Sequence, residues 1–240
     1  MSGLGKKQKT DSIQFNYHFR FENGTEKKFI LRLRRDDLSY ILPEIKEIPD
    51  WALLKNFRCQ HCPLDEALVT YCPVAVNIVD IINEFHDLPS FENAEVLVQS
   101  TNRSYHKKTS LQSGVSSMMG IRMVSSGCPV MGKLKPMLHF HLPFATLEET
   151  QVRALSIYLL AQYVKNKKGG EPDWEMDGLV KIYEDIRVLN LNVSRKIADL
   201  EDKDTSINSL VILNNFADYV TFTIDEFMID DLVTYVREFM

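Results

Sequence analysis

The sequence predicts an α+β protein, with a small N-terminal antiparallel sheet and one helix followed by a C-terminal helical bundle. Residues 13–21 alternate between apolar and polar side chains, which is typical of a half-buried strand. Beyond about residue 100, apolar residues recur at steps of three and four, which is typical of helices. We expect residues 1–10 to be a disordered tail and residues 11–240 to form a single domain. Its sheet-containing half would span 11–100 and its helical half 101–240.

The N-terminal strands form a predicted hairpin. Phenylalanine, tyrosine and isoleucine side chains occupy every second position from Ile13, and a second alternating run follows over residues 28–34. The Asn23-Gly24 step between them tolerates the positive φ that a tight turn needs. We therefore expect one apolar and one largely polar face on this hairpin.

The segment after the hairpin contains shorter elements. Residues 51–57 predict a short helix that packs on the hairpin. The Cys72-Pro73 step then opens a helix over 74–86, because proline is favoured at the first helical position. Residues 95–100 alternate again and predict a third strand.

The second half begins with a basic segment and a helix rich in small residues. Arg103, His106, Lys107 and Lys108 precede this helix, and we interpret them as a solvated loop. The helix itself spans 109–125, and its serines and glycines would let another backbone approach closely.

A capping box opens the next helix. Thr146 and Glu149 have the spacing at which each side chain bonds the other residue's backbone N–H. The helix runs to about Lys165, and Glu149 and Arg153 form an i,i+4 pair on it. Because few of its positions are polar, we expect it to be the central helix. Further helices are predicted after a capping Asp173, over 205–219 and over 226–238.

The four cysteines are the strongest functional signal. Cys59, Cys62 and Cys72 have the spacing C-x2-C-x9-C, and Cys128 follows 56 positions later. In a reducing compartment, cysteines act more often as ligands, catalytic thiols or core residues than as disulfides. Four thiolates suit either a tetrahedral zinc ion or an iron–sulfur cluster. The spacing is neither that of a zinc ribbon nor that of a bacterial ferredoxin.

Proline follows three of these cysteines directly, in Cys62-Pro63, Cys72-Pro73 and Cys128-Pro129. Proline at the first helical position leaves the cysteine at the N-cap. There the helix dipole stabilises the thiolate, which is the form that binds metals. This shared feature predicts that the four cysteines form one metal site, in a structural, electron-transfer or sensing role.

Three histidines are possible additional ligands. His61 lies inside the C-x2-C pair, and His139-Phe140-His141 would place two imidazoles on one side of an extended segment. Histidines at such positions are more often packed or hydrogen-bonded structural residues.

Two other functions remain open. Cys59 and Cys62 could be the dithiol of a thiol–disulfide oxidoreductase, although that class places the motif after a strand in a βαβ frame. Alternatively, the chain is a metal-free interaction protein whose cysteines belong to the core. The common hydrolase, nucleotide-binding and zincin motifs are absent from the sequence.

Charge and hydropathy bear on location and partners. Residues 1–35 contain nine Lys or Arg and three Asp or Glu, whereas residues 171–240 contain six and sixteen. The basic N-terminal region could meet an anionic partner, but we favour the interpretation that solvated strand faces and an acidic helical surface explain the asymmetry. No run of apolar residues is long enough to span a membrane, and no secretory signal opens the chain. We expect a cytoplasmic protein and neither a membrane nor a nucleic-acid partner.

Several short motifs together resemble a known family. They are Cys59-Gln-His-Cys-Pro-Leu64, Cys72-Pro-Val-Ala75, Ser126-Gly-Cys-Pro129 and Phe140-His-Leu-Pro-Phe-Ala-Thr146. With Glu149-Thr150 and residues 158–163, they resemble a family of bacterial proteins classed as a domain of unknown function. The resemblance spans nearly the whole chain and implies a bacterial protein of one domain. It implies no activity, substrate or cofactor.

Overall fold

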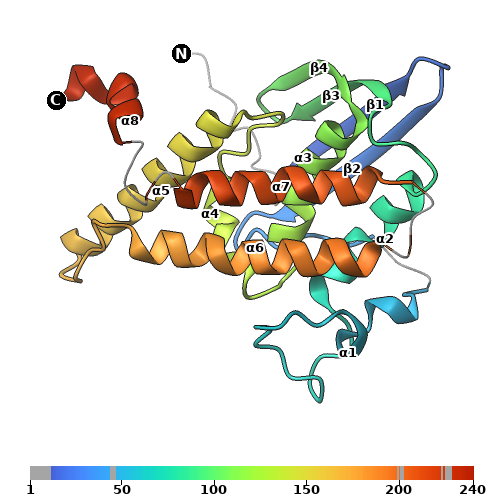
Figure 1. Cartoon of the computed structure of the whole chain (residues 1–240), viewed down its shortest axis with the longest axis horizontal. Helices are drawn as coiled ribbons and strands as arrows, with labels where there is room; N and C mark the ends of the chain where they lie inside the picture. Colours follow the sequence, from blue (N-terminus) through green and yellow to red (C-terminus); the bar gives the residue numbers. More distant parts are fainter. Residues whose placement is uncertain (1–11, 44–46, 199, 201–202, 223, 225–228) are drawn as a thin grey trace, which may run out of the picture.

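A four-stranded antiparallel sheet forms one layer of the protein (Figure 1). The computed structural model describes residues 12–43, 47–198, 200, 203–222, 224 and 229–240, so the predicted tail lies outside the described residues. The strands are β1 (Ser12–Phe21), β2 (Glu26–Arg34), β3 (Asn93–Ser100) and β4 (Ser104–Ser110), in the order β2-β1-β3-β4. The α+β class predicted from the sequence is confirmed.

The N-terminal hairpin is also confirmed. Phe19 pairs with Lys27 across β1 and β2, and Gly24 has a φ of +85° in the turn between the strands. Phe15, Tyr17, Phe19 and Phe21 are buried on one face. This alternation turns the apolar side of β1 toward the helices and the polar side toward solvent.

The polar face of the sheet carries ion pairs between neighbouring strands. Arg20 lies 3.1 Å from Glu26 and 3.3 Å from Glu95, and Lys28 lies 2.9 Å from Glu26. Several N-terminal basic residues are therefore paired within the sheet. Lys6, Lys7 and Lys9, which contribute to the basic region, lie outside the described residues.

Strand β4 corrects the expected end of the sheet. The basic segment that was interpreted as a loop is an edge strand, in which Lys108 pairs with Glu95 of β3. Its sequence, SYHKKTS, has hardly any apolar residues, and most of its side chains are exposed. Hydrophobic alternation cannot reveal such a strand. The sheet therefore reaches Ser110 rather than ending near residue 100.

The helices lie close to their predicted positions. They are η1 (Asp50–Ala52), α1 (Leu54–Phe57), α2 (Pro73–Phe85), α3 (Leu111–Val124), η2 (Met131–Leu134), α4 (Lys135–Leu138), α5 (Leu147–Lys167), α6 (Asp177–Ile197), α7 (Thr205–Phe222), α8 (Ile229–Val236) and η4 (Arg237–Phe239). The predicted last helix begins at 226, and residues 225–228 lie outside the described residues. Asp173 does bind the start of α6, because its Oδ2 accepts from the Gly178 backbone N–H at 2.8 Å. Across the described ranges, no helix is both long and apolar enough to cross a membrane.

Helix α3 packs directly against the sheet, and α7 lies between α3 and α6 (Figure 1). A Cβ atom at Gly114 would come within 2.7 Å of the Phe19 ring and 3.1 Å of Val96. Helix and sheet can approach so closely because this residue has no side chain. The expected use of small residues in this helix is confirmed at Gly114.

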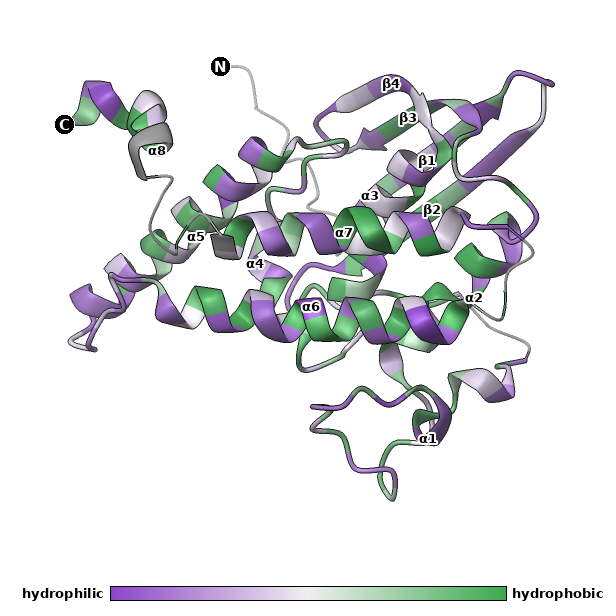
Figure 2. Cartoon of the chain, viewed as in Figure 1, coloured by the Kyte–Doolittle hydropathy of each residue, from purple (hydrophilic) through white to green (hydrophobic). Residues whose placement is uncertain are grey.

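The expectation that α5 is the central helix is wrong. Its capping box is formed, since Thr146 Oγ1 accepts from Glu149 N and Glu149 Oε2 accepts from Thr146 N. Leu160 and Tyr163, however, are 60% and 51% exposed. The apolar residues of α5 are spread around the helix, and its C-terminal end is hydrophilic and leaves the bundle (Figure 2). The inner helices are α3 and α7 instead.

Candidate functional site: a cluster of four cysteines

The segment that carries Cys59 and Cys62 is closed at its base. Leu53 forms a bridge with Tyr71, and Leu54 N donates to Thr70 O at 2.9 Å. Residues 58–69 thus form a loop whose two ends lie side by side next to α2. Within the loop, the Cys62 backbone N–H donates to Cys59 O at 3.1 Å, which turns the C-x2-C pair back on itself.

Cys72 is the N-cap of α2, with Pro73 in the first turn, as predicted. Its backbone N–H donates to Ala52 O at 2.8 Å, which fixes the cysteine against the base of the loop. The prediction for Cys62 is wrong, because Pro63 leads into irregular chain rather than a helix. Cys128 precedes the tight turn that leads into η2. Gly132 N, in the first turn of η2, donates to Cys128 O at 2.8 Å.

Asn77 of α2 joins the Cys72 and Cys128 segments. Its Nδ2 donates to Pro73 O at 2.8 Å and lies 3.4 Å from Ser126 O. The Cys128 backbone N–H lies 3.2 Å from Ser126 Oγ. These contacts bring the segment around Cys128 against the N-terminus of α2.

The four cysteines are brought together. Cys59, Cys72 and Cys128 are buried and Cys62 is half-buried. Burial and, to a smaller extent, the three other cysteines raise the pKa of Cys59 to about 12. Burial likewise raises the pKa of Cys72 to about 11, and the pKa of Cys128 in the same direction. Taken together, all six pairs of thiols are close enough to interact electrostatically.

Polar groups around the sulfurs offset part of the increase in the thiol pKa values. The backbone N–H groups of Ala75 and Val74 lower the pKa of Cys72, and those of Met131 and Val130 lower that of Cys128. Asn192 of α6 reaches the cluster from the helical half. Its Nδ2 lies 3.3 Å from Phe57 O and 3.5 Å from Cys59 Sγ. No sequence pattern points to Asn192, which is 133 residues away from Cys59.

The three histidines have different surroundings. His61 lies in the turn between Cys59 and Cys62, and its Nε2 is buried without a hydrogen-bond partner among the described residues. His139 is exposed, and His141 Nε2 lies 3.1 Å from the Tyr17 hydroxyl. The segment that holds them is a turn after α4, not the extended chain that was expected.

The sulfurs are not arranged as a ready-made site for one ion. Within the described ranges, no group of three or more His, Cys, Asp or Glu side chains could hold a metal ion as it stands. All four cysteines are free thiols. The chemistry of the donor set still suits a soft metal centre, because thiolates are the ligands that zinc and iron–sulfur clusters share.

The features expected of a thiol–disulfide oxidoreductase are not found around Cys59. The C-x2-C pair follows α1 rather than a strand. Attacking cysteines in that class have a lowered pKa, whereas the pKa of Cys59 is raised. This environment favours the protonated, unreactive form of the Cys59 thiol.

The three cysteine-containing motifs of the family resemblance meet in this cluster. A comparison with curated proteins and with solved structures finds no match. A family model does match the chain, over residues 15–235, and so covers both the cysteine cluster and nearly all of the described fold. The chain therefore belongs to the family described as Domain of unknown function (DUF6901).

Proposed function

We propose that the protein binds an iron–sulfur cluster through Cys59, Cys62, Cys72 and Cys128. The observation that carries the proposal is the mutual proximity of four thiols from three separate segments, one of which lies 56 residues after Cys72. Cysteines that serve only as core residues have no reason to gather in one place, since each behaves as a small apolar side chain.

The raised pKa values support a positively charged occupant. Burial is the main cause of the raised pKa values at Cys59 and Cys72, and the neighbouring thiols add to it because each disfavours the thiolate form of the others. A bound metal centre reverses this effect and holds the cysteines as thiolates. The N–H groups near Cys72 and Cys128 would then stabilise the charged sulfurs, as would Asn192 at Cys59.

Thiolate donors suit either a cluster or a single ion. Four sulfurs around one zinc ion each lie roughly 2.3 Å from it. A cluster places several irons and bridging sulfides between its thiolates and so accommodates sulfurs that lie further apart. Zinc is the alternative metal.

The surroundings also suit an electron-transfer or sensing role. Cys62 is half-buried, so one edge of the cluster would lie near solvent. Hydrogen bonds to cluster sulfurs and the extent of burial set the reduction potential of such centres. His61 precedes Cys62 in the chain, and its buried Nε2 has no hydrogen-bond partner among the described residues, so we propose that it donates one of these bonds.

The test is anaerobic purification of the full chain, followed by iron, sulfide and zinc analysis and a visible absorption scan. We expect iron and acid-labile sulfide in equal amounts and a broad visible absorption that dithionite bleaches. Cys128→Ser should remove most of the iron, whereas Ser104→Ala, at an exposed position of the edge strand β4, should retain it. One zinc per chain and no iron would favour the alternative metal.

A metal-free chain that neither takes up iron and sulfide nor gains thermal stability on reconstitution would overturn the proposal. Circular dichroism of each variant distinguishes loss of the centre from loss of the fold.

A further inference from the structure

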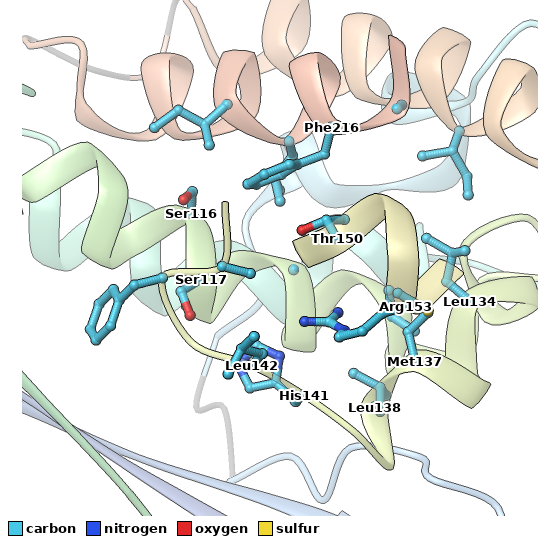
Figure 3. Close-up of a pocket in the computed structure, with 18 of the residues that line it drawn as sticks. Ser116, Ser117, Leu134, Met137, Leu138, His141, Leu142, Thr150, Arg153 and Phe216 are labelled. Atoms are coloured by element: carbon cyan, nitrogen blue, oxygen red, sulfur yellow. The ribbon is translucent and has the colours of Figure 1, made fainter. Parts of the chain in front are cut away.

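A cavity of about 230 Å³ lies in the helical half of the protein (Figure 3). Its walls come from α3, α5, α6 and α7, and from the segment between η2 and the start of α5. Most of the lining is apolar, as at Met137, Leu138 and Phe216. None of the four cysteines lines it, so it is a different place from the proposed cluster site.

One positive charge enters this apolar space, and the described lining residues include no counter-ion for it. The Arg153 side chain extends from α5 and its guanidinium points into the cavity, between Thr150 and His141 (Figure 3). Its Nε and Nη1 are buried and have no hydrogen-bond partner among the described residues. Burial lowers the pKa of Arg153, yet a guanidinium remains charged in proteins. The residue as a whole is half-buried, and the loss of water from its two unpartnered N–H groups is unfavourable to the fold.

The acid expected to pair with Arg153 is bound elsewhere. Glu149 lies one helical turn before Arg153, where an i,i+4 pair was predicted. Its Oε2 accepts the Thr146 backbone N–H at 2.8 Å in the capping box. No ion pair of Arg153 within 4.0 Å occurs among the described residues, so the expected pair is not formed; Glu149 acts on Arg153 only as a more distant charge.

The other polar groups of the cavity do not supply a negative charge. None of the described lining residues is Asp or Glu, and the exposed Lys107 adds a second cation. His141 is neutral, because burial lowers its pKa to about 3, and its Nε2 lies 3.1 Å from the Tyr17 hydroxyl. The cavity therefore combines an apolar body with an unmatched positive end.

We propose that this cavity binds a small monocarboxylate with an apolar body. The carboxylate would accept the free N–H groups of Arg153, with which it matches in shape and charge. The apolar part would lie against α3, α6 and α7. An engineered cavity of roughly 150 Å³ holds benzene. By that measure this one holds about nine or ten non-hydrogen atoms, as in octanoate or phenylacetate.

Calorimetric titration of the full chain with octanoate, octanol and acetate tests the proposal. Octanoate should bind at least tenfold more tightly than octanol, which has the same tail without the charge, because hydrogen bonds to charged groups are the stronger ones. It should also bind more tightly than acetate, which has the charge without the tail. In a chain-length series from butanoate to dodecanoate, affinity should peak at six to eight carbons.

Two variants separate charge from space. Arg153→Met keeps much of the side-chain volume and should weaken octanoate binding at least tenfold while leaving octanol binding unchanged. Because this substitution removes a charge whose buried N–H groups lack a partner among the described residues, it should not lower Tm in the absence of ligand.

Gly120→Ala keeps the charge and narrows the cavity, where its Cβ would meet Leu213 at 3.5 Å. It should shift the preferred chain length down by about one carbon. Arg195→Met, at an exposed position of α6, is the control.

Equal binding of octanoate and octanol would overturn the proposal, as would unaltered octanoate binding by Arg153→Met. So would an affinity that rises steadily through dodecanoate, because such a trend indicates adsorption to an exposed surface. A chain that binds none of these carboxylates at millimolar concentration holds only water in the cavity, and the proposal then fails.

Discussion

Arg122 and Asp80 form a two-point ion pair between α3 and α2. Arg122 Nη2 lies 2.6 Å from Asp80 Oδ1, and Nη1 lies 3.1 Å from Oδ2. The Arg122 side chain is 2% exposed, and Nη1 also donates to the Tyr40 hydroxyl at 2.9 Å. The pair joins the helix that begins at Cys72 to the helix that leads into Cys128. It therefore ties together the two helices next to which Cys72 and Cys128 lie.

Removal of the Asp80 charge should leave the Arg122 guanidinium buried and unpaired. We expect Asp80→Asn to lower the free energy of unfolding by roughly 3 kcal/mol, the lower end of the range for breaking a buried pair, since Asp80 is partly exposed. Urea denaturation followed by circular dichroism measures the change. Glu84→Gln is the matched control on the same helix. Its partner Lys27 is 3.0 Å away at the surface, so the expected loss is below about 1 kcal/mol. Equal losses for the two variants would contradict the role given to Arg122.

Much of the fold could be predicted because its signals are local. Alternating aromatics mark β1, and the Thr146–Glu149 capping box marks the start of α5 within one residue. Strand β4 escaped prediction because an exposed edge strand has no apolar side to detect. The place of α5 in the bundle depends on which helices cover it, and no property of its own sequence contains that information.

The candidate site was predictable only in its cysteines. Their proline neighbours correctly indicated an N-cap at Cys72, but not at Cys62, where the chain after Pro63 is irregular. Asn192 and Arg122 act through contacts with residues 133 and 42 positions away. Neither is distinguishable in the sequence from other polar residues on helices. The same holds for Arg153, whose local partner Glu149 is bound to the backbone instead.

Substitution by alanine should lower the stability of the protein at Gly114 of α3 but not at Gly120 of the same helix. Gly114→Ala places a methyl group within 2.7 Å of the Phe19 ring, so we expect a loss of about 1 to 3 kcal/mol from overpacking. Gly120→Ala meets Leu213 at 3.5 Å, an ordinary contact. Alanine's better helix propensity should then leave stability unchanged or raise it by up to about 1 kcal/mol. Thermal unfolding of the two variants decides the matter, and a similar Tm for both would refute close packing at Gly114.

Alkylation should distinguish Cys62 from the other cysteines in chelator-treated protein. Cys62 is half-buried, whereas Cys59, Cys72 and Cys128 are buried and have raised pKa values. Because the reactive form is an accessible thiolate, iodoacetamide at pH 8 should modify Cys62 first. Peptide mass spectrometry over time gives the order, and all four should react at similar rates in urea. Earlier modification of Cys72 or Cys128 than of Cys62 would show that the cluster is open to solvent.

His141 should make the protein sensitive to mild acid. Burial lowers its pKa from 6.5 to about 3, so the unfolded chain binds a proton between these values and the folded chain does not. Its contribution to stability is therefore complete above pH 6.5 and is lost as the pH falls toward 3. Urea midpoints at pH 7.5 and pH 5 should differ for the wild type and differ less for His141→Gln, whose amide can still reach the Tyr17 hydroxyl. His139→Gln, two residues earlier and exposed, should keep the wild-type pH dependence. If His139→Gln instead flattened the profile and His141→Gln did not, the buried imidazole would not be the group that senses acid.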